Sequence, residues 1–130
     1  MKLKLITLAL CSCLLLAGCN ANVKTEASYR QISMGEAVTM MAEEKDYIIL
    51  DVRTKDEFAS GHIPNAINIP NEVIGTTAIP SLPNKDQLIL VYCRSGNRSK
   101  QASEKLAALG YTNIVEFGGI NSWPGEIVTD

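Results

Sequence analysis

Apolar positions after residue 28 follow two alternating patterns along the chain. Short, nearly continuous apolar runs bounded by polar or breaking residues are typical of buried strands. Between these runs, apolar residues recur three or four positions apart, as on one face of a helix. The expected strands are residues 29–32, 47–52, 66–69, 88–92 and 113–117. The expected helices are residues 33–44, a short helix that opens at residue 54 and stops at Gly61, and residues 99–109.

Local signals at the ends of these segments support the assignment. Ser33 with Glu36, and Thr54 with Glu57, match the capping box, in which a hydroxyl and a carboxylate satisfy free N–H groups at a helix start. Gly110 suits the left-handed residue that often follows a helix. Strands that alternate with helices predict one α/β domain, with a mostly parallel sheet flanked by helices.

The first residues of the chain do not fit this pattern. A short basic start is followed by an apolar run over residues 5–17 and then by small residues. This order is typical of a secretory signal segment, here residues 1–18. The alternative is a transmembrane helix, which needs about 20 apolar residues, more than this run contains.

The signal segment ends in the sequence LAGC at residues 16–19, which resembles the lipobox of bacterial lipoproteins. The resemblance implies cleavage before Cys19 and a diacylglyceryl group on its sulfur; the alternative is an ordinary signal peptide that ends near a cysteine. Buried acyl chains hold a protein at a membrane. We therefore expect residues 19–28 to be a lipidated cysteine with a polar tether. Residues 29–130 would then fold outside the cytoplasm, facing the periplasm or the exterior of a bacterial cell.

Charge and cysteine content narrow the function classes. Twelve basic and 14 acidic side chains give a formal net charge of −2, without a basic run, which argues against nucleic-acid binding. Cys11 and Cys13 fall in the signal segment and Cys19 is expected to be lipidated. Cys93 is then the one thiol of the folded domain, so no internal disulfide is expected. With His62 as the single histidine, a metal site is not expected either.

The strongest chemical signal is the segment CRSGNRS, which runs from Cys93 to Ser99 between an apolar strand and an amphipathic helix. Sites in α/β folds lie at the carboxyl ends of strands. Gly96 allows a positive φ, so the backbone N–H groups of such a loop can turn inward. The following helix adds the partial positive charge of its N-terminus. We therefore expect an anion cradle with a sulfur at its base.

This cradle suits Cys93 as a nucleophile, because thiolates are stabilised by helix N-termini and nearby arginines. Arg94 and Arg98 supply two positive charges and can also bind an anionic substrate. The alternative is an inert buried cysteine. The side chains and amides of Ser95 and Asn97 are further candidates for substrate binding. Ser99 is a candidate N-cap of the helix that can also touch the cradle.

Several motifs, in their order and spacing, resemble the rhodanese homology domain over about residues 29–127. They are DVR at 51–53, EF at 57–58, GHI at 61–63, AINIP at 66–70, YCRSGNR at 92–98, and GG at 118–119 followed by Trp123. The resemblance implies a five-stranded parallel sheet between helices. It also implies sulfur transfer through a persulfide on Cys93, with residues 93–98 as the active loop and no cofactor. Related phosphatases place five residues between cysteine and arginine, where this chain has four, so a phosphatase is the less favoured alternative.

The implied reaction has two steps. Cys93 takes the outer sulfur of a donor such as thiosulfate and passes it to a thiophilic acceptor, either cyanide or a thiol. A thioredoxin-like protein is an expected thiol partner. The alternative is a sulfur carrier or docking module that serves partner proteins and turns over small molecules poorly. Asp51 and Arg53 are expected to support the loop structurally; the alternative is that they line the active-site face. His62 is expected to form a structural hydrogen bond rather than to act as a catalytic base, and Trp123 to pack rather than to serve as a substrate platform.

Overall fold

The computed structural model describes residues 28–75 and 77–130. The predicted signal segment, Cys19 and most of the tether lie outside the described residues, so those expectations stay predictions. Within the described part of the chain, every helix is too short or too polar to span a bilayer.

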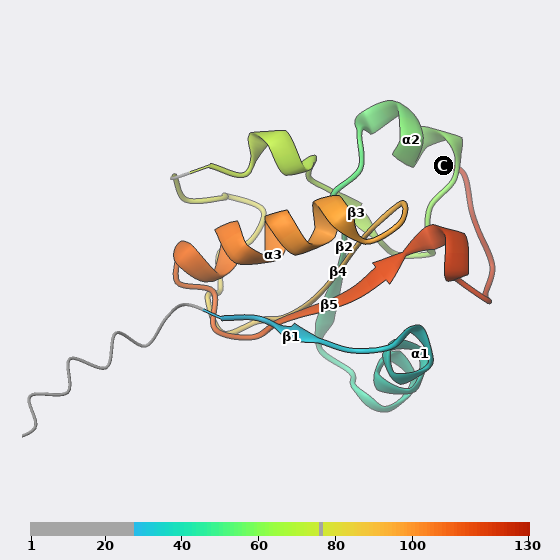
Figure 1. Cartoon of the computed structure of the whole chain (residues 1–130), viewed down its shortest axis with the longest axis horizontal. Helices are drawn as coiled ribbons and strands as arrows, with labels where there is room; N and C mark the ends of the chain where they lie inside the picture. Colours follow the sequence, from blue (N-terminus) through green and yellow to red (C-terminus); the bar gives the residue numbers. More distant parts are fainter. Residues whose placement is uncertain (1–27, 76) are drawn as a thin grey trace, which may run out of the picture.

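Five strands form one sheet in which every pairing is parallel, in the order β1-β5-β4-β2-β3 (Figure 1). The strands are β1 Arg30–Gln31, β2 Tyr47–Asp51, β3 Ile67–Asn68, β4 Leu88–Cys93 and β5 Ile114–Gly119. The α-helices are α1 Met34–Glu43, α2 Lys55–Ser60 and α3 Asn97–Ala108; the 3₁₀ turns are η1 Asn71–Val73 and η2 Ile120–Ser122. The predicted α/β fold, with a five-stranded parallel sheet flanked by helices, is confirmed.

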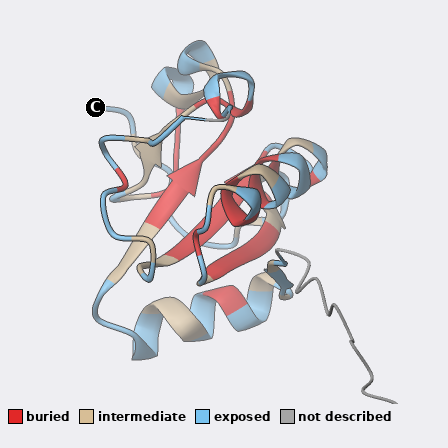
Figure 2. Ribbon diagram, turned by 90° about the vertical axis from the view of Figure 1, so that its left-hand side faces the viewer, coloured by how far each residue is buried: buried red, intermediate tan, exposed pale blue. Residues whose placement is uncertain are grey.

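The sheet buries a different hydrophobic cluster on each face, because side chains along a strand alternate between the faces. Ile89, Val91 and Cys93 of β4 belong to a cluster that includes Ala102 and Leu106 of α3. The intervening β4 residues belong to the cluster that α1 covers. Figure 2 shows the buried strands between these layers. Cys93 therefore faces α3, the helix that follows it in the chain.

Helix ends follow the predicted signals in two places. At α1, Ser33 Oγ accepts from Glu36 N at 3.1 Å and the Glu36 carboxylate accepts from Ser33 N at 3.2 Å, so the capping box is complete. At the end of α3, Gly110 has a φ of 95° and donates to the carbonyl of Ala107, while Tyr111 donates to that of Leu106. These two bonds form a Schellman motif, which ends the helix at the predicted glycine.

Two predicted details are wrong. The last long helix begins at Asn97, two residues before the expected start, and Gly96 rather than Ser99 is its N-cap residue. A φ of 107° at Gly96 turns the chain into the helix early, which places Ser99 in the first turn with its hydroxyl pointing toward the loop. At α2, Thr54 caps Glu57 N as predicted, but the Glu57 carboxylate pairs with Arg98 instead of completing the box.

Candidate active site

The sulfur of Cys93 lies at the carboxyl end of β4, against the first turn of α3, and the residue is 1% exposed. Gly96 N donates to Sγ at 3.0 Å, and Sγ lies 3.3 Å from the hydroxyl oxygen of Ser99. The loop between β4 and α3 is therefore shorter than expected, because α3 already begins at Asn97. The cradle consists of residues 94–96 and the first helical turn.

The pKa of the Cys93 thiol reflects two opposing influences. Burial raises the pKa, but the hydrogen bond with the Ser99 side chain and those from the backbone of Ser99, Gly96 and Ser95 outweigh burial and lower it below its ordinary value. Hydrogen bonds to the charged form favour that form. The amides around the sulfur therefore point inward, as an anion cradle requires.

Two glycines allow the backbone to approach so closely. Gly96 adopts a φ of 107°, which L side chains rarely reach. Gly119, at the end of β5, lies directly against the loop: a Cβ on it would sit 2.1 Å from the carbonyl oxygen of Arg94 and 2.5 Å from Ser95 N. The GG pair at residues 118–119 thus supplies one wall of the cradle.

The two arginines of the loop have different surroundings. Arg98 forms a two-pronged ion pair with Glu57 of α2, at 2.7 Å to Oε1 and 2.9 Å to Oε2. The Arg98 hydrogen bond holds the pKa of Glu57 at about 2. Arg94 is exposed and lines a cavity of about 240 Å³, to which Ser60 and Asn121 also contribute. Arg98 is thus anchored across the loop, and Arg94 presents its charge toward solvent.

The remaining predicted loop residues lie at the surface or in the turn. The side chains of Ser95 and Asn97 are exposed, whereas Gly96 and Ser99 are buried. Ser95 and Gly96 line a cavity of about 360 Å³ beside the loop. The loop therefore offers mainly backbone N–H groups to the sulfur.

Asp51 and Arg53 form a buried ion pair beneath the site. Arg53 Nη2 lies 2.6 Å from Asp51 Oδ2 and also donates to the carbonyl of Gly61 at 2.7 Å. The hydroxyl of Tyr92, the residue before Cys93, donates to the same Asp51 oxygen at 2.7 Å. This network links β2, β4 and the start of the segment after α2, and so fixes the base of the loop.

His62 and Trp123 make structural contacts. His62 stacks on Phe58 with ring centroids 3.7 Å apart, and its Nδ1 lies 2.9 Å from the Phe58 carbonyl. Its Nε2 faces the carboxylate of Asp130. Trp123 packs against the hydrophobic cluster on the α1 face and donates from Nε1 to the Glu126 carbonyl. Both residues therefore hold chain segments together around the site.

One residue of the site was missed from the sequence. Glu116 of β5 is 3% exposed, and its Oε1 accepts from Ser99 Oγ at 2.6 Å and from Gly118 N at 2.8 Å. The available signal was a charged side chain inside an apolar strand, directly before a glycine pair. A buried carboxylate needs hydrogen bonds of this kind.

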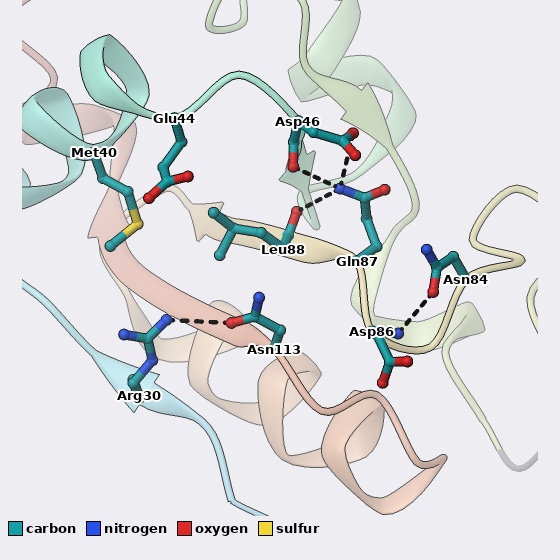
Figure 3. Close-up of a pocket in the computed structure, with 9 residues that line it drawn as sticks. All are labelled: Arg30, Met40, Glu44, Asp46, Asn84, Asp86, Gln87, Leu88 and Asn113. Carbon is teal, nitrogen blue, oxygen red and sulfur yellow. Dashed lines mark hydrogen bonds between the residues drawn. The ribbon is translucent and has the colours of Figure 1, made fainter.

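A separate hollow of about 320 Å³ lies at the opposite end of the sheet, where β4 and β5 begin (Figure 3). Its polar groups bind one another: Gln87 donates to the carbonyl of Asp46 at 2.9 Å and Arg30 donates to Asn113 at 3.2 Å. No cluster of His, Cys, Asp and Glu in residues 28–75 and 77–130 could hold a metal ion.

Comparisons with known proteins place this chain among its relatives. Residues 33–126 match the family described as "Rhodanese-like domain". A rhodanese-like domain protein of Staphylococcus aureus has a similar structure, with a TM-score of 0.65 and 33% identity over 78% of this chain and 98% of that one. Thiosulfate sulfurtransferase PspE of Escherichia coli is 35% identical over 71 residues, which cover 55% of this chain and 68% of PspE.

A longer relative shares only this domain. Adenylyltransferase and sulfurtransferase UBA4 of Candida albicans is 32% identical over 104 residues, which cover 75% of this chain but 24% of that protein. The chain thus spans about a quarter of that relative's length. With the match over residues 33–126 and the shared parallel fold, this chain belongs to the rhodanese family.

Proposed function

We propose that this protein is a sulfurtransferase that moves sulfane sulfur from a thiosulfate-type donor to a thiophilic acceptor through a persulfide on Cys93. The observation that carries the proposal is the position of Sγ, 3.0 Å from Gly96 N at the N-terminus of α3. Inward N–H groups and a helix N-terminus stabilise negative charge on a sulfur.

In the first step, the Cys93 thiolate attacks the outer sulfur of the donor. A new sulfur–sulfur bond forms at Cys93, the donor's own sulfur–sulfur bond breaks, and sulfite leaves with the electron pair of that bond. The charge then rests on the outer sulfur of the persulfide. The N–H groups that faced the thiolate also face this charge, as donors do in an oxyanion hole.

In the second step, an acceptor with a nucleophilic carbon or sulfur attacks the outer sulfur of the persulfide. Cyanide gives thiocyanate and a thiol gives a new persulfide; in both cases the Cys93 thiolate is released. The loop residues Arg94, Ser95, Gly96, Asn97, Arg98 and Ser99 surround this exchange. We assign donor binding to Arg94, because Glu57 already pairs with Arg98.

The relatives support the class of reaction and the kind of donor. PspE is named as a thiosulfate sulfurtransferase, and UBA4 carries sulfurtransferase in its name. The adenylyltransferase part of the UBA4 name is not transferred to this chain, which spans 24% of that protein.

Steady-state turnover tests the proposal. With thiosulfate and cyanide, the full chain should produce thiocyanate and sulfite in equal amounts, with the parallel double-reciprocal lines of a ping-pong reaction. Cys93→Ser should produce neither product. The proposal fails if the wild-type chain produces no thiocyanate with any of a panel of thiosulfate, thiosulfonate and persulfide donors. Fast discharge to a reduced thioredoxin-like protein, with slow discharge to cyanide, would instead assign the acceptor role to a partner protein.

A further inference from the structure

A buried carboxylate lies behind the reactive sulfur, on the same face of the sheet. Val115 and Phe117 of β5 pack in the cluster on the α1 face, so Glu116 between them points to the α3 face, which Cys93 also faces. Glu116 is 3% exposed and also lines the cavity of about 360 Å³ beside the loop. The persulfide chemistry described above does not use this group.

Glu116 and Cys93 meet at a single hydroxyl group, that of Ser99. The Ser99 oxygen lies 2.6 Å from Glu116 Oε1 and 3.3 Å from Cys93 Sγ. A serine hydroxyl has one proton to donate. The shorter, charge-assisted bond is the stronger one, so the proton points to Glu116 and Ser99 accepts from the thiol.

Ionisation of Cys93 changes this arrangement. A thiolate needs the Ser99 proton for itself, but the Glu116 carboxylate competes for the same proton. Two negative charges would also face each other across one hydroxyl group, and like charges disfavour each other's ionised form. Glu116 therefore opposes ionisation of the thiol, whereas the inward N–H groups favour it.

We propose that Glu116 is a positioning residue that acts through Ser99 to restrain thiolate formation at Cys93 and to favour the sulfur-loaded state. The proposal rests on the proposed function. During loading, the bond between Sγ and the donor's outer sulfur forms, the donor's sulfur–sulfur bond breaks, sulfite leaves with its electron pair, and the thiol proton goes to solvent. Sγ is then a neutral bridging sulfur, and the charge lies one bond farther from Glu116.

Other charged groups near the sulfur do not replace this effect. Arg98 of α3 acts on Cys93 through its charge, but Glu57 binds its guanidinium, and Glu72 of η1 also acts on it. Lys100 shares the cavity with Glu116 but forms no ion pair with it within the described part of the chain. Two neutral acceptors, the carbonyls of Gly96 and Gly118, also lie 2.9 and 3.3 Å from Ser99 Oγ. Glu116 is the charged group that competes with Cys93 for the Ser99 proton, and so the stronger competitor.

The test is the pH dependence of Cys93 alkylation in the full chain. Iodoacetamide labelling is followed by mass spectrometry of the tryptic peptide 86–94, whose one cysteine is Cys93. In Glu116→Gln, the midpoint of the rate profile should fall by about one pH unit, which is about tenfold in rate on the acid side. The rate at high pH should stay within about twofold. An unchanged or higher midpoint overturns the proposal.

Ser99→Ala gives a second test, and its measurement in the wild-type background does not require Glu116→Gln to fold. In the wild-type background, loss of the hydroxyl should raise the midpoint by less than about half a unit, because Glu116 competes with the thiolate for the Ser99 proton. In the Glu116→Gln background, the same loss should raise the midpoint by about one unit, because a neutral amide competes less strongly than a carboxylate and the hydroxyl can then donate to the thiolate. A rise of a full unit or more in the wild-type background contradicts the proposal.

Persulfide loading of the wild-type chain by thiosulfate, measured on the same peptide, separates the two hypotheses. If loading occurs and the midpoint of Glu116→Gln does not fall, the positioning role is wrong and the proposed function stands. If the wild-type chain does not load, the proposed function fails whatever the alkylation profiles show.

Discussion

Arg94 and Arg98 differ in what surrounds their guanidinium groups, although both follow Cys93 within the same loop. Glu57 compensates the charge of Arg98 with two hydrogen bonds, whereas Arg94 is exposed beside a cavity of about 240 Å³. From the sequence alone, the two arginines were equivalent candidates to bind an anionic substrate. Arg98 makes the anchoring contact with Glu57, so the proposed function assigns the attraction of an anionic donor to Arg94.

We expect Arg94→Gln to raise the KM for thiosulfate by about tenfold and to change kcat by less than about twofold. A charge-assisted hydrogen bond contributes roughly this difference. Lys100→Gln is the matched control, because it removes another exposed positive charge near the loop. Steady-state kinetics at two salt concentrations checks the prediction. If both variants bind thiosulfate like the wild type, Arg94 does not receive the donor.

At the scale of elements, α2 and α3 are tied by the Glu57–Arg98 pair. We expect Glu57→Gln to lower the free energy of unfolding at neutral pH by about 1 kcal/mol, as for a partly exposed ion pair. The pair lowers the pKa of Glu57 from 4.5 to about 2. Its contribution is therefore complete above about pH 4.5 and is lost as the pH falls toward 2, where the folded-state carboxylate takes up a proton.

Urea unfolding between neutral pH and pH 2 measures this contribution. The difference between wild type and Glu57→Gln should shrink over the acidic range. Asp56→Asn removes a neighbouring, exposed carboxylate of α2 and should show no comparable trend. A difference that stays constant down to pH 2 would show that the ion pair is not its cause.

The contact between β5 and the loop gives a second prediction at this scale. In Gly119→Ala, the new Cβ would lie 2.1 Å from Arg94 O and 2.4 Å from Arg94 C, so backbone atoms of the loop must move. We expect the rate of persulfide loading to fall by about a hundredfold, because small displacements of reacting groups are costly.

The matched control is Gly35→Ala in α1, where the nearest atom to a new Cβ is Ser33 Oγ at 4.0 Å. Loading rates and urea unfolding should be measured together. The free energy of unfolding of Gly119→Ala should fall by about 1–3 kcal/mol, as for overpacking. Normal loading in a folded Gly119→Ala variant would contradict the role given to this wall of the cradle.

At the scale of the whole molecule, most of the fold could be predicted from the sequence. Continuous apolar runs marked the long strands, and capping residues marked α1 and the end of α3, because these signals are local. Two features could not be predicted from local signals, because they depend on contacts between residues far apart in the sequence. The Glu57 carboxylate binds Arg98 of α3 instead of completing the cap of its own helix. The Ser99 hydroxyl contacts the sulfur of Cys93 and the carboxylate of Glu116 instead of capping α3.

The same limit applies to the site. The Cys93 loop could be identified from its position between a strand and a helix. The contact of Glu116 with Ser99 could not be predicted, because it depends on which face of β5 Glu116 occupies. Because side chains along β5 alternate between the two faces of the sheet, Glu116 lies under the loop, next to Ser99. A charged residue in an apolar strand is the kind of signal that identifies such positions in related chains.

The predicted anchor also belongs to the whole molecule, and it lies outside the described residues. We propose that Cys19 carries a lipid that holds the domain at a membrane of the bacterial envelope, on its extracytoplasmic side. In cells, Cys19→Ser should move the protein from the membrane fraction to the soluble fraction, while Cys13→Ser should leave it in place. Cys19→Ser protein that remains with the membrane would count against the lipid anchor.

The most direct test of the central claim is the mass of the peptide that contains Cys93. After incubation of the full chain with thiosulfate and removal of the excess donor, the tryptic peptide 86–94 should carry one added sulfur atom. Cyanide should remove this sulfur, and the peptide from Cys93→Ser should never gain it. A wild-type peptide that stays unmodified with thiosulfate, or a sulfur found instead on another cysteine, would contradict sulfur transfer through Cys93.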